Sequence, residues 1–177
     1  MLLLPFLFNS CSGNVDDAVN SSEIDELQKK SVVENERLNL ENATFTFNSN
    51  GDVSKVSLND IKNLWERQIL EEEDLNVNLV NFELIKTYDD LDEKYYYFLK
   101  TTDEKGQIST GTYLTLNQNK DASLSLKISA GSKECSCKGC PNGCNLQVTG
   151  SRCSCSRCFP QTPNSKCEKT EKQVVIT

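Results

Sequence analysis

Histidine is absent from all 177 residues of the chain. Histidine is the commonest general base and the commonest nitrogen ligand of metals. Its absence excludes Ser-His-Asp catalysis, Cys-His catalysis and the usual metallohydrolase sites, and any metal site would have to be built from sulfur and carboxylate groups. Because the carboxylates fall in charged runs without a nucleophile motif beside them, we expect a non-enzymatic protein.

Basic residues are also scarce, since 19 Lys and Arg stand against 26 Asp and Glu, a net charge of −7. Phosphate binding needs a basic face, so nucleic acid is not an expected partner. Residues 12–130 hold 12 basic and 23 acidic side chains, whereas residues 131–177 hold seven basic and three acidic ones. Either an acidic solvated body carries a mildly basic tail, or the basic segment docks on an acidic surface, which could be the body itself.

Ordinary hydrophobes are nearly missing from residues 135–167, where only Leu146, Val148 and Phe159 are present. Such a segment cannot bury enough surface to offset its chain entropy, so it is either cross-linked or disordered. It does contain eight of the nine cysteines of the chain: Cys135, Cys137, Cys140, Cys144, Cys153, Cys155, Cys158 and Cys167. In exported proteins, segments of this kind are normally stapled by disulfides, and we expect disulfides here.

The cysteines form an internal repeat, because a C-x-C-x2-C triplet at residues 135–140 recurs at residues 153–158. The two sulfurs of a C-x-C pair in extended backbone lie near the outer limit of bridging distance. We therefore expect Cys135 and Cys137 to pair elsewhere, most simply with Cys153 and Cys155. Eight cysteines allow many other connectivities, so the full pairing stays open.

The alternative use of the same eight cysteines is a thiolate metal site. Two sets of four thiolates could hold two Zn²⁺ ions without histidine. The C-x-C units with serine between the cysteines also resemble metallothionein-like clusters, which bind soft ions such as Cu(I) or Zn²⁺. The chain would then sequester or deliver Zn or Cu(I), whereas the disulfide interpretation requires no cofactor.

The chain begins with an apolar run, MLLLPFLF at residues 1–8. It is too short to span a bilayer, which needs about 20 apolar residues, but it matches the apolar part of an export signal. Ser10-Cys11, directly after it, resembles the lipobox of bacterial lipoproteins. The resemblance implies that Cys11 is diacylated and anchors the protein in a membrane, and Ser12 would favour the outer membrane of the cell envelope.

Two other interpretations of the N-terminus remain, an ordinary secretory signal cut after Ser12 and a buried core segment. Under the export interpretations Cys11 leaves the pool of pairing thiols, so an odd nine becomes the even eight that a disulfide framework requires. Residues 12–40 are then a polar tether, in which residues 22–36 are a candidate short helix.

Local signals predict a hairpin and a helix after residue 41. The sequence ATFTF, an Asn50-Gly51 turn and VSKVSL indicate strand, turn and strand. Ser57-x-x-Asp60 predicts a helix start, and apolar residues at helical spacing extend the helix to about Leu70. The acidic run at residues 71–74 is either a solvated helix exit or an oxygen-ligand calcium site.

Four further segments are predicted strands: residues 76–88, 94–100, 107–116 and 122–128. The sequence thus predicts an α+β fold, one helix packed on a four- to five-stranded antiparallel meander over residues 41–130. This arrangement is cystatin-like in outline, which implies no activity. A small Cys-rich loop module at residues 131–177 follows, and the ending QVVIT could add a last strand.

Tyr95 and Tyr97 share one face of the predicted strand at residues 94–100. They either pack as an ordinary sheet face or form an exposed aromatic row that binds a glycan or peptide. We therefore expect a lipid-anchored cell-envelope protein with a binding or structural role, whose stapled module or aromatic face meets a protein or glycan partner.

Overall fold

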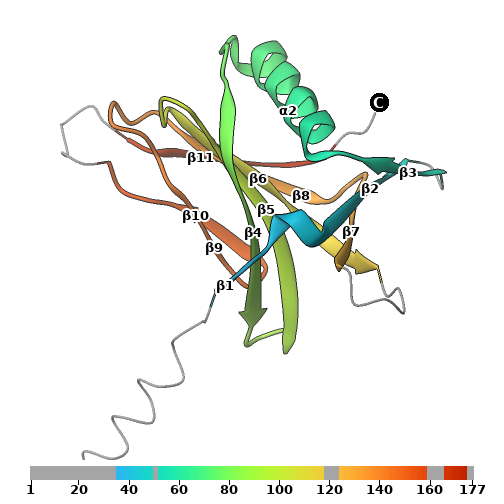
Figure 1. Cartoon of the computed structure of the whole chain (residues 1–177). Helices are drawn as coiled ribbons and strands as arrows, with labels where there is room; N and C mark the ends of the chain where they lie inside the picture. The colour runs from blue at the N-terminus through green and yellow to red at the C-terminus, as the bar shows by residue number, and fades with distance from the viewer. Residues whose placement is uncertain (1–34, 50–51, 118–123, 159–165, 175–177) are drawn as a thin grey trace, which may run out of the picture. The chain divides into compact units, whose positions relative to one another are not determined.

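The computed structural model describes residues 35–49, 52–117, 124–158 and 166–174 (Figure 1). Cys11, the polar tether and nearly all of the candidate helix at residues 22–36 lie outside the described residues. The described part begins with strand β1, Glu36–Leu38, and a 3-10 turn, Leu40–Asn42.

The predicted hairpin and helix are both present. Strands β2 (Ala43–Ser49) and β3 (Asp52–Val56) pair antiparallel. Helix α2 (Leu58–Glu73) begins at the Ser57 cap, whose hydroxyl accepts from the Asp60 amide while the Asp60 carboxylate accepts from the Ser57 amide. The helix continues three residues past the predicted end and closes with Asp74 in the left-handed conformation. None of the described helices is long and apolar enough to cross a bilayer.

The four strands that follow form the predicted antiparallel meander. They are β4 (Leu79–Asp89), β5 (Lys94–Asp103), β6 (Ile108–Asn117) and β7 (Leu124–Ser129). Strand β1 adds to the outer edge of β4. At the other end β2 pairs parallel with β7, so the N-terminal hairpin joins the same sheet.

The Cys-rich segment contributes two strands to this sheet. Strand β8 (Lys133–Lys138) pairs with the first half of β6, whose second half pairs with β7. Strand β11 (Glu168–Gln173) pairs with β8 along its whole length, so the last strand starts five residues before the QVVIT ending. The expected division near residue 130 therefore falls at the turn between β7 and β8, within one continuous sheet.

The remaining strands, β9 (Leu146–Thr149) and β10 (Arg152–Cys155), form a separate antiparallel hairpin. Two clusters of buried side chains lie on opposite faces of the main sheet, because neighbouring residues of a strand point to opposite sides. Leu99 belongs to the cluster that also holds the α2 residues Ile61, Trp65 and Ile69. Phe98 belongs to the other cluster, with the cysteines and the β9 side chains Leu146 and Val148. The helix and the cysteine hairpin thus cover opposite faces of the sheet.

Candidate functional site

All eight cysteines of the C-terminal segment are paired with one another. The expected bridges Cys135–Cys153 and Cys137–Cys155 are present, with Cα–Cα distances of 6.6 and 5.6 Å. A third bridge, Cys140–Cys158, joins the last members of the two triplets with the same separation of 18 residues. The fourth, Cys144–Cys167, ties the turn after the first triplet to the start of β11. The sequence repeat thus forms a ladder of three disulfides, two between β8 and β10 and one between the residues that follow these strands.

Sulfur replaces hydrocarbon in the core of this segment. Cys135 and Cys137 are fully buried, and Phe98 lies beneath them at 0% exposure. Gly111 stands opposite Cys135 in the β6–β8 register, and a Cβ atom there would collide with the Phe98 ring and the Leu99 carbonyl oxygen. The glycine therefore leaves the space that lets Phe98 pack across β6 toward the disulfides.

The turn of the β9–β10 hairpin is clamped to β4. The Asp89 carboxylate accepts from the Ser151 amide at 2.8 Å and from the Ser151 hydroxyl at 2.7 Å. These hydrogen bonds, together with those from Leu91 and Asp92, hold the pKa of Asp89 well below its usual range. Gly150, at φ 56°, donates its amide to Thr87 and lies so close to Asp89 that a Cβ would meet its Cγ at 2.6 Å.

The acidic end of α2 docks on lysines of the Cys-rich segment. Lys138 of β8 forms an ion pair with Glu73. Lys172 of β11 lies 2.6 Å from a Glu72 oxygen and 3.5 Å from an oxygen of Glu134. The interpretation in which the basic segment docks on the acidic body is therefore the one that the structure supports, and two of the four acids at residues 71–74 take part.

Glu134 is the buried member of this charge cluster. Its residue is only 5% exposed, and burial raises the pKa of its carboxyl although Lys172 acts in the opposite direction. One of its oxygens, Oε2, has no hydrogen-bond partner among the described residues. Lys172 thus supplies the positive charge that offsets the cost of burying an ionised Glu134 carboxylate.

The structure does not present Tyr95 and Tyr97 as one exposed row. Tyr95 is 57% exposed, and its ring lies 5.0 Å from the ring of Tyr88 and 4.6 Å from the Lys86 ammonium. Tyr97 is half-buried and packs against the cluster under α2. The aromatic pair at this edge is therefore Tyr88 with Tyr95, joined across β4 and β5.

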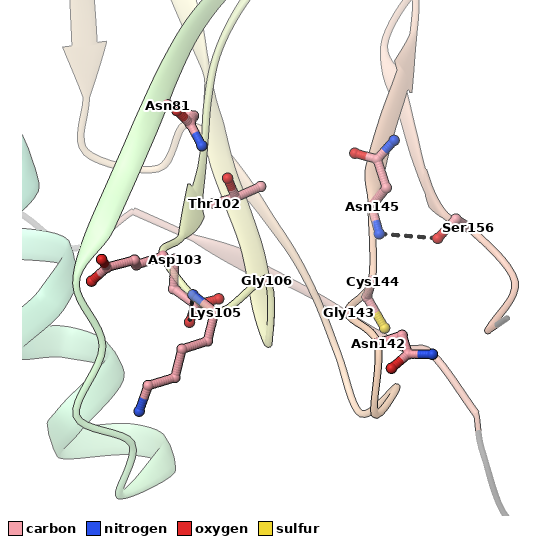
Figure 2. A pocket seen from close by; sticks show the side chains of 11 residues that line it. Asn81, Thr102, Asp103, Lys105, Gly106, Asn142, Gly143, Cys144, Asn145 and Ser156 are labelled. Carbon is pink, nitrogen blue, oxygen red and sulfur yellow. Dashed lines mark hydrogen bonds between the residues drawn. The ribbon is translucent and has the colours of Figure 1, made fainter. Parts of the chain in front are cut away.

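A polar hollow of about 430 Å³ lies between the β5–β6 turn and the loop after β8 (Figure 2). One wall comes from β4, β5 and that turn, and the other from the disulfide-bonded loop and the end of β10. Its lining residues are Asn81, Thr102, Asp103, Glu104, Lys105, Gly106, Asn142, Gly143, Cys144, Asn145 and Ser156.

A β-bulge places Asn81 in the first wall. The β4–β5 register shifts between Val80 and Glu83, and Asn81 takes the left-handed conformation at φ 53°. Asparagine tolerates this conformation better than most residues, and bulges re-aim side chains. The Thr101 hydroxyl donates to the Val80 carbonyl at 2.6 Å and fixes the bulge. The alternation of apolar residues is broken at Asn81, which is the one sequence signal that could have located it.

The second wall is held by hydrogen bonds and by covalent bonds. The Asn145 amide donates to the Ser156 hydroxyl at 3.0 Å, and Lys100 donates to the Asn145 side-chain oxygen at 2.7 Å. Burial lowers the pKa of Lys100. Gly143 lies so close to the Gly106 carbonyl that no Cβ would fit, and the two walls therefore touch at these glycines. The adjacent bridge Cys144–Cys167 keeps this loop in place.

Comparison of the chain with protein-family models, with curated proteins and with solved structures finds no match.

Proposed function

We propose that this is a non-enzymatic, lipid-anchored protein of the cell envelope that binds a neutral glycan in the polar hollow. The single observation that supports this role is the lining of the hollow, where uncharged amide and hydroxyl groups of Asn81, Thr102, Asn145 and Ser156 lie on two opposed walls. Sugar hydroxyls both donate and accept hydrogen bonds, as these side chains do. Three charged side chains also lie in the lining, those of Asp103, Glu104 and Lys105. The two carboxylates already have donors, since Asp103 accepts from the Lys105 and Ile108 amides and Glu104 accepts from the Asn78 side chain.

The rigidity of both walls supports binding rather than a purely structural role. One wall belongs to paired strands and the other to a loop held by a disulfide, so little conformational entropy would be lost when a ligand binds. The volume of about 430 Å³ lies within the range of small-ligand sites.

The test of this site is Asn81→Gly, because glycine keeps the left-handed backbone while removing the side chain that carries the amide group. Binding of the full chain to an array of neutral and anionic oligosaccharides is measured first, and the affinity for the best neutral ligand is then compared between variants. We expect Asn81→Gly to weaken binding about tenfold, the effect of one lost hydrogen bond of roughly 1.4 kcal/mol.

The matched control is Ser154→Ala, an exposed residue of β10 outside the hollow, which should leave the affinity unchanged. Binding of Asn81→Gly at the wild-type affinity would contradict the site. Selection of anionic ligands or unmodified peptides over neutral glycans would contradict the ligand class.

The lipid anchor is supported by the pairing of the cysteines. Because the eight described cysteines bridge one another, none of them is left to pair with Cys11. Four disulfides are also typical of an oxidising compartment outside the cytosol. We expect Cys11→Ala to move the protein from the membrane fraction to the soluble fraction. The control is the double variant Cys144→Ala/Cys167→Ala, which removes one bridge and should remain with the membrane.

The second candidate function is binding of Zn²⁺ or Cu(I) by the same thiols. The Sγ atoms of Cys137, Cys155 and Cys167 lie within 4.8 Å of one another, an arrangement from which a metal site could form once the bridges are reduced. Since all eight sulfurs are bridged in this structure, the candidate applies to the reduced chain alone. Native mass spectrometry of protein isolated without added thiol distinguishes the two, because the disulfide form carries no metal mass.

A further inference from the structure

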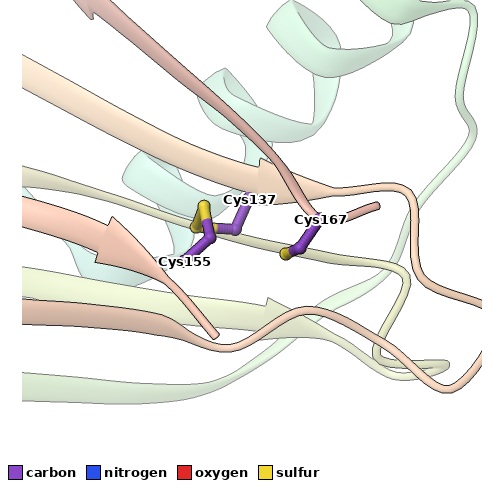
Figure 3. Close-up of side chains that lie close together, drawn as sticks. All are labelled: Cys137, Cys155 and Cys167. Atoms are coloured by element: carbon purple, nitrogen blue, oxygen red, sulfur yellow. A yellow bond between two sulfur atoms is a disulfide. The ribbon is translucent and has the colours of Figure 1, made fainter. Parts of the chain in front are cut away.

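Cys167 lies where three disulfides meet. Its Sγ lies within 4.8 Å of the Sγ atoms of Cys137 and Cys155, which form one bridge (Figure 3). It also lies within 4.8 Å of Cys140, which belongs to another bridge, and of its own partner Cys144. A thiolate released at this point would have neighbouring disulfides within reach.

Accessibility separates Cys167 from all of the other seven described cysteines except Cys155. Cys137, Cys140, Cys144 and Cys158 are at most 5% exposed, whereas Cys167 is half-buried and precedes the edge strand β11. Cys155 is also half-buried, but its sulfur lies against the carbonyl oxygens of Ser136 and Glu168. The exposed side chain of Lys166 stands next to Cys167 in the chain, and a positive charge favours approach of an attacking thiolate.

We propose that Cys167 is the entry point for thiol–disulfide exchange with a dithiol, such as the active site of an exported thiol oxidoreductase. A thiolate of the dithiol attacks Cys167 Sγ, the Cys144–Cys167 bond breaks, and its electron pair leaves on Cys144. The result is a mixed disulfide at Cys167 and a thiolate at Cys144.

The freed Cys144 thiolate has a nearby acceptor. Its Sγ lies within 4.8 Å of the Sγ of Cys140, and the Gly143 amide donates to the Cys140 carbonyl at 3.0 Å, which closes the turn between the two cysteines. Attack on Cys140 forms a Cys140–Cys144 bridge and displaces Cys158, which takes up a proton. The second thiol of the reagent then releases Cys167 as a thiol. One dithiol is oxidised, and its two hydrogens end on Cys158 and Cys167.

This exchange would release two thiols and keep the rest of the ladder. The bridges Cys140–Cys158 and Cys144–Cys167 would be replaced by one bridge inside the Cys140–Cys144 turn. The bridges Cys135–Cys153 and Cys137–Cys155, which tie β10 to β8, are retained. The site is therefore a two-electron switch between two bridges, to Cys158 and Cys167, and one bridge inside the turn. Its exchange does not depend on what the polar hollow binds.

The experiment treats the oxidised full chain with one equivalent of dithiothreitol, caps new thiols with N-ethylmaleimide and maps the tryptic peptides. Cleavage after Lys and Arg places Cys140 and Cys144 in one peptide and separates Cys158 from Cys167. We expect the label on Cys158 and Cys167, with a new bridge inside the peptide of residues 139–152. Label on Cys144 with Cys167 would overturn the migration step, and first labelling of Cys135, Cys137, Cys153 or Cys155 would overturn the entry point.

The control variant is Cys140→Ser/Cys158→Ser, which lacks the acceptor bridge. Its label should stay on Cys144 and Cys167, because the Cys144 thiolate has no disulfide to attack at position 140. A second variant, Cys144→Ser/Cys167→Ser, lacks the entry point, and its first reduction should be slower than wild type by about tenfold or more. An unchanged rate would overturn the proposal.

Discussion

At the scale of single residues, the junction between the cysteine hairpin and the sheet depends on one glycine and one carboxylate. Gly150 brings the hairpin turn within contact of Asp89, and Asp89 accepts both hydrogen bonds from Ser151. Both residues are buried, so water cannot replace the hydrogen bonds that Asp89 accepts, and no larger side chain fits at position 150. The contact is therefore sensitive to the addition of a single methyl group.

Gly150→Ala tests this contact. We expect the free energy of unfolding to fall by roughly 2–4 kcal/mol, because the methyl group collides with Asp89 and an L residue is strained at positive φ. The control is Gly131→Ala, where φ is +82° but nothing lies within 4 Å of the added Cβ. It should cost only about 1 kcal/mol of backbone strain. Equal losses in urea unfolding would show that the Asp89 contact is unimportant.

Asp89→Asn tests the charge of the same clamp. The hydrogen bonds from Ser151 depress the pKa of Asp89 in the folded state, so this carboxylate adds stability above its ordinary unfolded pKa of about 4. That stability is lost as the pH falls below the unfolded pKa and through the lower pKa of Asp89 in the folded protein. We expect the wild type to lose more stability than Asp89→Asn between pH 5 and pH 2. Parallel curves of melting temperature against pH for the two proteins would refute the role.

At the scale of elements, strand β8 links the two sides of the fold. Cys135 and Cys137 point to the cysteine side and form bridges to β10. Glu134 and Lys138, on the opposite face, meet Lys172 and the acidic end of α2. The alternation of a β-strand thus separates disulfide chemistry on one face from ion pairing on the other.

Lys172→Met tests the ionic side of this strand. The variant leaves Glu134 buried without its counter-charge, and we expect a loss of roughly 2 kcal/mol, below that of a fully buried pair because Lys172 is partly exposed. Burial already raises the pKa of Glu134, so the loss should be larger at pH 8, where the carboxyl must ionise, than at pH 5. Adding Glu134→Gln should recover stability at pH 8. No recovery would mean that Lys172 acts mainly through Glu72.

Local signals in the sequence predicted the elements better than their assembly. The Ser57 capping box, the β2–β3 hairpin and the antiparallel meander each depend on residues close in the chain, and each is confirmed. The parallel pairing of β2 with β7 joins segments about 80 residues apart, and no local pattern specifies it. The polar hollow was not predicted, because it brings together Asn81 and Asn145, which lie far apart in the chain. The broken alternation at Asn81 is the one local signal that could have located it.

At the scale of the whole described unit, two clusters of different chemistry lie on the two faces of one sheet. The cluster under α2 is ordinary hydrocarbon, and the cluster beneath the hairpin is made mostly of disulfides. Because ordinary hydrophobic residues are scarce in residues 135–167, the disulfides supply the stabilisation that burial of apolar side chains cannot. The rigid wall of the hollow depends on the bridge Cys144–Cys167, and the four bridges together favour the proposed oxidising compartment.

The most direct test is the intact mass of the natively exported protein, measured with and without reductant under non-denaturing conditions. We expect a mass eight hydrogens below that of the reduced form, two for each of the four bridges, together with diacyl mass on Cys11. Free thiols with added zinc or copper mass would contradict it and would make the C-terminal segment a metal site.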